Sequence, residues 1–276
     1  MEQVLKTMLE NVRAKSPLVH NITNYVTVND VANVLLAAGG SPIMSDDADD
    51  VEDITSICGG LNINIGTLNK NTIPSMFLAG KKANALGHIV LLDPVGAGAS
   101  RLRTDTANRL MREVRFDAVR GNISEIKTLC TGSGSTKGVD ADAVDAVTEA
   151  NLDDGVQLVK AFAKQTGCII AVTGAIDLVS DGERCWCIRN GRAEMSRITG
   201  TGCQLSALMT AFLVANPDRK LDAAAAAVCM MGLAGEIGWA NMQPGDGNST
   251  YRNRIIDAIF NMTGDALEEG AKYELR

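Results

Sequence analysis

The chain has 276 residues, of which 46% are hydrophobic and only 4% aromatic, so its core must be built mainly from aliphatic and alanine side chains. A formal net charge of -7 leaves no basic excess for the phosphate backbone of DNA or RNA, so no nucleic acid partner is expected. The start of the chain is charged and amphipathic, and no apolar run reaches membrane-spanning length, so we expect no signal sequence and no membrane partner.

The seven cysteines are an odd number and are scattered without a C-x-x-C pair. Zinc ribbons and redox motifs need closer, repeated spacings. Scattered thiols in a chain of this length suit a reducing compartment, where disulfides are rare. We therefore expect a cytoplasmic protein.

Short runs rich in Val and Ile alternate with longer segments of helical period, which predicts an α/β fold with a largely parallel sheet. Gly39, Gly87 and Gly167 are expected to cap three of the helices. In chain order we expect helices at 4–14, 28–38, 51–58, 72–86, 104–114 and 153–166, and strands at 41–44, 61–65, 88–93, 118–121 and 168–172.

The rest of the chain changes character. Residues 178–188 alternate around Asp181 and Gly182, which predicts an antiparallel hairpin added to the parallel sheet. Three further helices are expected at 203–215, 221–240 and 249–262, and the Gly- and Ser-rich residues 131–138 are expected to form a loop. No repeat or linker interrupts the chain, so we expect one domain over residues 1–276.

The segment from Ile198 to Ala207 places Gly200, Thr201 and Gly202 directly before a helix that starts at Cys203. Converging backbone N–H groups and the positive end of the helix dipole would form a site for an anion there. A thiol in the first helical turn typically has its pKa lowered from about 8.5. The alternative is a glycine-rich turn that caps the helix, with the cysteine packed inside.

Two polar strand ends add to this candidate site. Asp93 follows an apolar run, and open α/β sheets bind ligands at such strand ends. After Arg120, a strand leads into Asn122 and Glu125, which are three residues apart and could hold a hydrated Mg²⁺. The alternative, which the spacing alone favours, is a helix N-cap with Glu at the third helical position.

Thr173 ends another strand and could present its hydroxyl to a nucleotide. His20 precedes a polar loop at 21–26 that could face a substrate, and we leave it open whether this histidine contacts a ligand or only makes structural hydrogen bonds. Only two histidines and no G-x-S-x-G elbow are present, which disfavours hydrolase chemistry.

Taken together, six ordered motifs resemble the ribokinase-like superfamily and, more closely, the hydroxyethylthiazole kinase family. They are Pro17 to Asn24, Ser41 to Ser45, Asn64 to Thr67, Asp93 to Gly98, Arg120 to Glu125 and Thr199 to Cys203. The resemblance spans nearly the whole chain and implies a three-layer α/β/α sandwich with a mostly parallel central sheet. It also implies an ATP-dependent kinase in a homotrimer with active sites between subunits.

The resemblance carries over to particular residues. It implies substrate contacts at Met44 and Gly200, with a further one expected at Asn24, ATP contacts at Arg120 and Thr173, and Mg²⁺ handling near Asp93 and Glu125. Cys203 stands where most ribokinase-like enzymes have an aspartate base, and our hypothesis is that it orients the alcohol and accepts its proton late. The amides of Gly200, Thr201 and Gly202 would hold the transferring phosphoryl group.

Two other functions fit the same fold. A ribokinase-like lyase of the nucleotide-hydrate dehydratase type also uses ATP, but it would be expected to have an aspartate at position 203. A non-catalytic sensor would bind nucleotide and thiazole without transfer.

Overall fold

The computed structural model describes residues 3–132 and 146–276. Their strands form a sheet in the order β2-β1-β3-β4-β5-β6-β7-β8-β9. The pairs from β2 to β6 are parallel, and β7, β8 and β9 extend the sheet with antiparallel pairs. The strands are β1 (Leu18–Ile22), β2 (Ser41–Met44), β3 (Gly60–Asn64), β4 (Ile89–Asp93), β5 (Ala118–Asn122), β6 (Ile169–Thr173), β7 (Asp177–Ser180), β8 (Cys185–Ile188) and β9 (Tyr273–Leu275).

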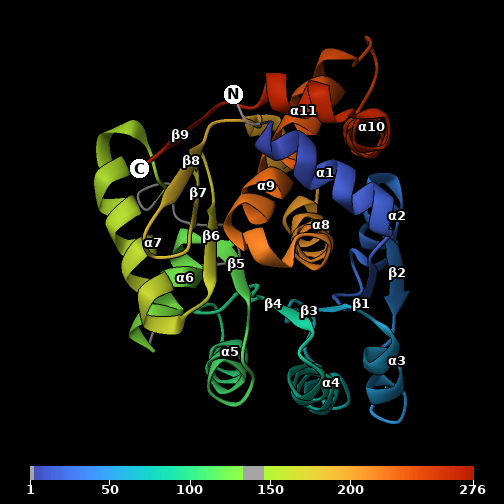
Figure 1. Ribbon diagram of the computed structural model, residues 1–276, viewed down its shortest axis with the longest axis vertical. Helices are drawn as coiled ribbons and strands as arrows, with labels where there is room; N and C mark the ends of the chain where they lie inside the picture. Colours follow the sequence, from blue (N-terminus) through green and yellow to red (C-terminus); the bar gives the residue numbers. More distant parts are fainter. Residues whose placement is uncertain (1–2, 133–145) are drawn as a thin grey trace.

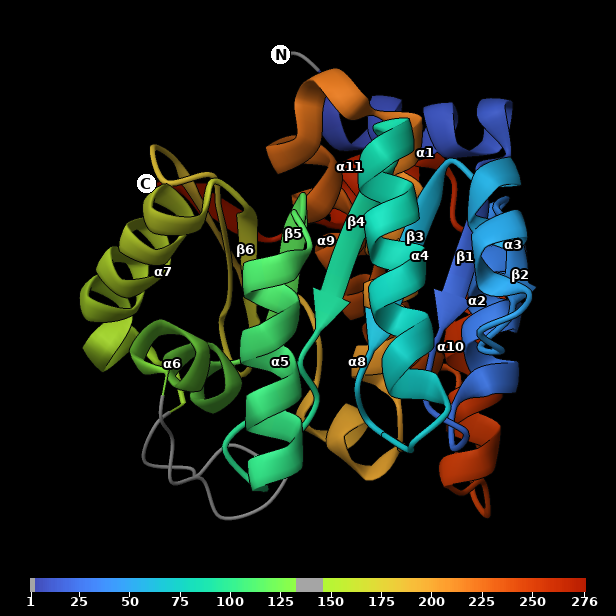
Figure 2. The same cartoon turned by 90° about the horizontal axis from the view of Figure 1, so that it is seen from below.

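Helices cover both faces of this sheet, so the predicted three-layer α/β/α sandwich is confirmed (Figures 1 and 2). One face carries α3 (Val51–Ile57), α4 (Thr72–Leu86), α5 (Arg101–Glu113), α6 (Ile123–Thr131) and α7 (Leu152–Thr166). The other face carries α2 (Val28–Ala38), α8 (Thr201–Ala215) and α9 (Lys220–Ala240), with α1 (Val4–Lys15), α10 (Asn248–Asn261) and α11 (Gly264–Gly270) packed outside them. Short 3₁₀ turns lie at Glu149–Asn151, Ala193–Arg197 and Pro217–Arg219.

Most elements predicted from periodicity are present, and the three predicted glycine caps are left-handed as expected. The predicted polar loop at 21–26 is wrong for its first two residues, because Asn21 and Ile22 lie in β1, which was not predicted. The strand accommodates polar side chains because they have partners: Asn62 on β3 donates to Asn21 Oδ1 at 3.1 Å. The loop predicted at 131–138 lies mostly outside the described residues, and β9 and α11 were not predicted.

On the face that carries α2, α8 and α9, the middle helix α8 is apolar on nearly all sides, because it packs on β3 and β4 and is flanked by α2 and α9. Its close approach to β3 requires a glycine, since a Cβ atom at Gly60 would lie 2.5 Å from Val214 on α8. In the part of the chain that the structure describes, one helical stretch, Pro217–Ala240, is long and apolar enough to cross a membrane. Most of that stretch is buried inside the fold, so its apolar surface is used in packing.

Candidate active site

The site predicted from the sequence lies at the carboxyl ends of the parallel strands. Asp93 ends β4, Arg120 lies in β5 and Thr173 ends β6, while Asn24 follows β1 closely. The N-terminus of α8, with Cys203 in its first turn, approaches the same edge. Because parallel strands present their carboxyl ends on one side of the sheet, side chains distant in sequence meet there.

A chain of hydrogen bonds joins Asp93 to Cys203. Asn64 Nδ2 donates to Asp93 Oδ2 at 2.8 Å, and Asn64 Oδ1 accepts from Asn24 Nδ2 at 3.3 Å. The same Asn24 nitrogen donates to Cys203 Sγ at 3.0 Å. Thr27 Oγ1 donates to Asn24 Oδ1 at 3.1 Å, which fixes the orientation of the Asn24 amide. Two amides therefore couple the carboxylate to the thiol.

Asp93 is a fully buried carboxylate with one occupied and one open oxygen. Oδ2 accepts from Asn64 and from Ser206 Oγ, the latter at 2.8 Å, whereas Oδ1 has no hydrogen-bond partner and lies 3.7 Å from Arg120 Nη1. Burial raises the pKa of Asp93, and Arg120, Ser206 and Asn64 act in the opposite direction. The open oxygen is therefore suited to a cation.

Glu125 caps the helix that follows β5. Its Oε2 accepts from the Asn122 backbone N–H at 2.8 Å and Asn122 Oδ1 accepts from the Glu125 N–H, so the capping-box alternative is confirmed. Its Oε1 accepts from the Gly96 N–H at 2.8 Å. Burial, and then the negative charge of Asp93, raise the pKa of Glu125 to about 7.

The donor set of this pair fits Mg²⁺. The ion prefers oxygen ligands and is typically held by one or two carboxylates, with water and substrate phosphates completing its shell. Asp93 Oδ1 is a buried carboxylate oxygen that accepts no hydrogen bond. Glu125 is close enough for the negative charge of Asp93 to raise its pKa. Within residues 3–132 and 146–276 no three or more acidic, His or Cys side chains are arranged so that they alone could hold a metal ion, so a metal here would need further ligands from water and the substrate.

The α8 N-terminus has the geometry of an anion site, with Arg120 placed against it. Gly200 has φ +85°, and a Cβ atom there would lie 2.1 Å from Thr27 Cγ2. A Cβ atom at Gly202 would lie 2.4 Å from Arg120 Nη1, so the guanidinium lies directly over this turn. Arg120 Nη2 also donates to Thr173 Oγ1, which brings together the two residues expected to contact ATP. No side chain caps the helix start itself.

The pKa expected for Cys203 is wrong in direction. The helix N-terminus predicted a lowered pKa, but burial, followed by the negative charge of Asp93, raises the pKa of Cys203 to about 11. The thiol is only 8% exposed, and the hydrogen bonds from Asn64 and Asn24 offset only part of the effect. Desolvation outweighs the helix dipole here because the dipole acts on a group largely removed from water.

Met44, predicted to contact substrate, lies in the same small apolar cluster as Cys203. It is partly buried at the end of β2 and packs, together with Val95, against that cluster. The cluster also contains Val19, Val31, Leu35, Ala207 and Ala211. Apolar side chains therefore pack around the thiol.

His20 makes structural hydrogen bonds with both ring nitrogens. Nε2 is 2.9 Å from the carbonyl oxygen of Ser45, which can only accept, so Nε2 carries the proton and Nδ1 accepts from Thr55 Oγ1 at 3.0 Å. Burial lowers the pKa of His20. The histidine thus fixes the segment after Met44, and the structural alternative holds.

Three polar residues that received no role from the sequence belong to this site: Asn64, Ser206 and Asp177. Asn64 and Ser206 bind Asp93, and their signal was a polar side chain in an otherwise apolar strand or helix. Asp177 Oδ1 accepts from the Gly174 N–H at 2.8 Å. Although part of the Asp177 surface is accessible, burial raises the pKa of this carboxyl group to about 7, and the positive charge of Arg120 acts in the opposite direction.

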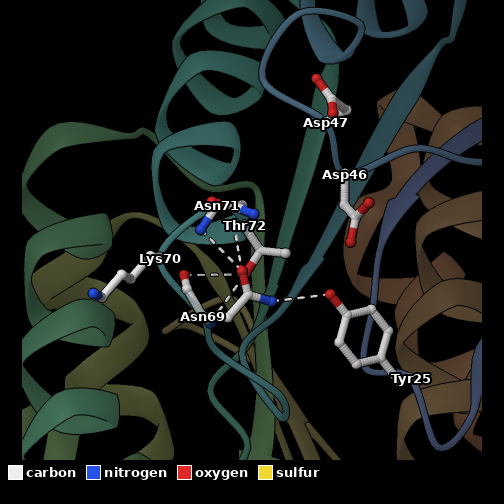
Figure 3. A pocket seen from close by; sticks show the side chains of 7 residues that line it. All are labelled: Tyr25, Asp46, Asp47, Asn69, Lys70, Asn71 and Thr72. Atoms are coloured by element: carbon white, nitrogen blue, oxygen red, sulfur yellow. Dashed lines mark hydrogen bonds between the residues drawn. The ribbon is translucent and has the colours of Figure 1, made fainter.

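A polar pocket of about 480 Å³ opens at the same edge of the sheet, among the loops that follow β1, β2 and β3 (Figure 3). Tyr25 Oη accepts from Asn69 Nδ2 at 2.9 Å on one side, and Asp46 and Asp47 stand apart from this pair on the other. Lys70 points away from the two aspartates. The remaining lining residues are Asn71 and Thr72. None of the predicted site residues lines this pocket, but Tyr25 directly follows Asn24.

Known proteins resemble this chain over its full length. The hydroxyethylthiazole kinase of Clostridium acetobutylicum is 58% identical over 271 residues, which cover 98% of this chain and 99% of that protein. The structure of a hydroxyethylthiazole kinase from Pyrococcus horikoshii OT3 superposes with a TM-score of 0.88 at 32% identity and covers 100% of both chains. A ribokinase-like superfamily protein from Enterococcus faecalis shares the fold alone, with a TM-score of 0.61, 11% identity and 94% coverage of both chains.

The family match agrees with the geometry of the site. The sequence model of the hydroxyethylthiazole kinase family matches residues 9–265. This range contains every residue of the hydrogen-bond chain from Asp93 through Asn64 and Asn24 to Cys203, and also Ser206, which donates to Asp93. With that match and high identity to a relative across nearly its whole length, the chain belongs to the hydroxyethylthiazole kinase family.

Proposed function

We propose that this protein transfers the γ-phosphoryl group of ATP to the primary hydroxyl of hydroxyethylthiazole, a step of thiamine salvage. The observation that carries the proposal is the amide chain that links a buried carboxylate, Asp93, to a thiol at a helix N-terminus, Cys203. Transfer through a loose transition state needs positioning and charge compensation more than a strong base. Family membership supports the choice of alcohol.

In this proposal the apolar cluster beside Cys203 receives the thiazole ring, with Met44 as one wall and Asn24 near the hydroxyl. Gly200, Thr201 and Gly202 offer backbone N–H groups to the transferring phosphoryl group. Arg120, held by Thr173, compensates the remaining phosphate charge from the nucleotide side.

Asp93 and Glu125 would hold Mg²⁺, which when bound supplies positive charge to the phosphates and to Asp93. The charge of Asp93 is one cause of the raised pKa of Cys203. Compensating that charge lowers the pKa of the thiol, and Asn24, which donates to Sγ, stabilises the thiolate. Cys203 can then orient the alcohol and accept its proton late in the transfer.

We further propose that residues 1–276 form one kinase domain, located in the cytoplasm, and that three chains assemble into a homotrimer. One sheet connects all the described strands, which supports a single domain. Exposed apolar side chains on the elements around the edge strand β2 support self-association: Val26, Leu36 and Ile57. Light scattering after gel filtration measures the assembly.

The test of the activity is incubation with γ-labelled ATP, Mg²⁺ and hydroxyethylthiazole, followed by separation of the products. We expect label in a thiazole phosphate and none when the thiazole is omitted. Cys203→Ala is expected to lower kcat by about 100-fold, whereas Cys203→Asp, which provides a carboxylate as proton acceptor, retains turnover. ATP consumption that drives dehydration of a nucleotide hydrate would indicate the lyase, and binding of both ligands without product would indicate a sensor. Either result refutes the kinase.

A further inference from the structure

One arginine outside the predicted site motifs joins two loops of the catalytic edge. Arg103 lies in the first turn of α5 and is half-buried. Its Nη2 donates to the carbonyl oxygen of Gly66, in the loop after β3, at 2.7 Å. Its guanidinium also lies against Gly96, in the loop after β4, where a Cβ atom would be 2.2 Å from Nη1 and 3.2 Å from Cζ. The side chain thus contacts both loops at once.

In the loop after β3, Gly66 accepts from Arg103 and also contacts the two amides, Asn64 and Asn24, that lead to the Cys203 thiol. The Gly66 N–H donates to Asn64 Oδ1 at 2.9 Å, and the same oxygen accepts from Asn24 Nδ2, which donates to Cys203 Sγ. A Cβ atom at Gly66 would lie 3.0 Å from Asn24 Cβ, so the loop packs directly on Asn24. A shift of Gly66 would therefore change the donor that Cys203 receives.

In the loop after β4, Gly96 lies against the Arg103 guanidinium and donates a hydrogen bond to the Glu125 carboxylate. Gly96 has φ +74°, and its N–H donates to Glu125 Oε1 at 2.8 Å. Asp93 ends β4 three residues before Gly96, so the loop that Arg103 contacts joins the two carboxylates. A shift of Gly96 would therefore alter the carboxylate pair.

Arg103 acts through geometry. None of the ion pairs formed within residues 3–132 and 146–276 includes it, so its removal leaves no acidic side chain of these residues without its ion-pair partner. A planar guanidinium can donate to Gly66 while it contacts Gly96, whereas a lysine ammonium is a compact donor that can satisfy only the first contact. Lysine should therefore replace it only in part.

We propose that Arg103 is a positioning residue that couples the alcohol end of the site, Asn24 and Cys203, to the carboxylate end, Asp93 and Glu125. It does so by holding the loop after β3 against the loop after β4. The proposal rests on the proposed kinase function for its kinetic consequence, but not for its structural one. Misplacement of reacting groups by about 1 Å costs on the order of 100-fold in rate.

The kinetic experiment compares Arg103→Ala, Arg103→Lys and Arg101→Ala. Arg101 is the matched control, because it lies two residues away on the same helix and its side chain is 94% exposed, with a single exposed ion pair to Asp105. We expect Arg103→Ala to lower kcat by about 10- to 100-fold with less than about 2-fold change in KM for ATP. The kcat of Arg103→Lys should lie between those of Arg103→Ala and the wild type, and guanidinium ion added at millimolar concentration should partly restore the kcat of Arg103→Ala. The kcat of Arg101→Ala should equal that of the wild type.

A second measurement needs no substrate and no turnover. The rate of iodoacetamide alkylation is followed against pH for the peptide that contains Cys203, with the peptide of the partly exposed Cys130 as internal reference. Loss of an oriented donor should move the Cys203 profile to higher pH in Arg103→Ala, and to a smaller extent in Arg103→Lys, without moving that of Cys130.

The two measurements separate the possible failures. If the wild type forms no thiazole phosphate but the Cys203 profile still shifts with Arg103, the proposed function fails and the coupling stands. If kcat and the Cys203 profile of Arg103→Ala both match those of Arg101→Ala, the coupling is wrong. If Arg103→Ala does not fold, Arg103→Lys decides: a wild-type kcat and Cys203 profile in that variant refute the proposal.

Discussion

Glu125→Gln tests whether the buried carboxylates of Asp93 and Glu125 form a binding site for a cation. The wild-type side chain is 5% exposed, and burial and the charge of Asp93 raise its pKa from 4.5 to about 7. The substitution removes the ionisable group and keeps the size of the side chain. It therefore removes the electrostatic cost of ionising Glu125 inside the fold.

The sign and size of the effect follow from proton linkage. Between pH 4.5 and about 7 the folded protein binds more protons at Glu125 than the unfolded chain does, so the free energy of unfolding falls as pH rises through this range. At about 1.4 kcal/mol for each tenfold change in proton affinity, the wild type loses about 3 kcal/mol at this residue by pH 8.5. Glu125→Gln lacks that loss, whereas the cost of replacing one oxygen by an NH₂ group is the same at every pH.

The assay is urea unfolding at fixed protein concentration from pH 5 to pH 8.5, first with EDTA and then with Mg²⁺. We expect the stability of Glu125→Gln relative to the wild type to rise by about 3 kcal/mol across this range in EDTA. Added Mg²⁺ should restore stability to the wild type at high pH, because a cation that binds only the folded state stabilises it, and should restore much less to the variant.

Asp177→Asn is the matched control, because the pKa of Asp177 is also raised to about 7. This variant should likewise flatten the pH dependence but should keep the full response to Mg²⁺. Parallel pH profiles for wild type and Glu125→Gln would show that Glu125 ionises normally. An equal Mg²⁺ response in the two proteins would remove Glu125 from the metal site.

Two further substitutions examine the neighbours of this carboxylate pair. In Gly202→Ala the new Cβ would lie 2.4 Å from Arg120 Nη1, so the guanidinium must move, and we expect KM for ATP to rise about 10-fold with an unchanged circular dichroism spectrum. Gly247→Ala, where the Cβ meets open space, is its control, and equal KM values in the two variants would contradict the placement of Arg120. Ser206→Ala removes a hydroxyl that donates to the buried Asp93 carboxylate at 2.8 Å. We expect the free energy of unfolding, measured with urea at pH 8, to fall by about 1–3 kcal/mol. The loss should be smaller at pH 5, because burial raises the pKa of Asp93 and more of this carboxyl group is protonated there. A loss that does not depend on pH would mean that Ser206 contributes only packing.

Local periodicity predicted much of the layout because it depends on residues close in sequence. The bounds of α2, α4 and β2 agree with those expected, since the glycines after the two helices end them and an apolar run marks the strand. β1 escaped prediction because His20 and Asn21 make it look polar. Those side chains are tolerated only because Thr55, Ser45 and Asn62, distant in sequence, satisfy them.

The site shows the same division. Glycine turns and polar strand ends are local signals, and they were sufficient to nominate Asp93, Glu125 and Cys203, whereas the family resemblance nominated Arg120. The sequence by itself therefore determined the alternation of strands and helices, the glycine turn before α8 and the polar residues that end the strands.

Only the tertiary structure decided how those residues act on one another. The sign of the Cys203 pKa shift depends on burial and on Asp93, which lies 110 positions earlier in the chain yet shares the site through Asn64 and Asn24. The role of Arg103 appears only when the loops after β3 and β4 stand side by side. Hydrogen bonding and desolvation act through space, so these properties follow from the fold and cannot be read from spacing along the chain.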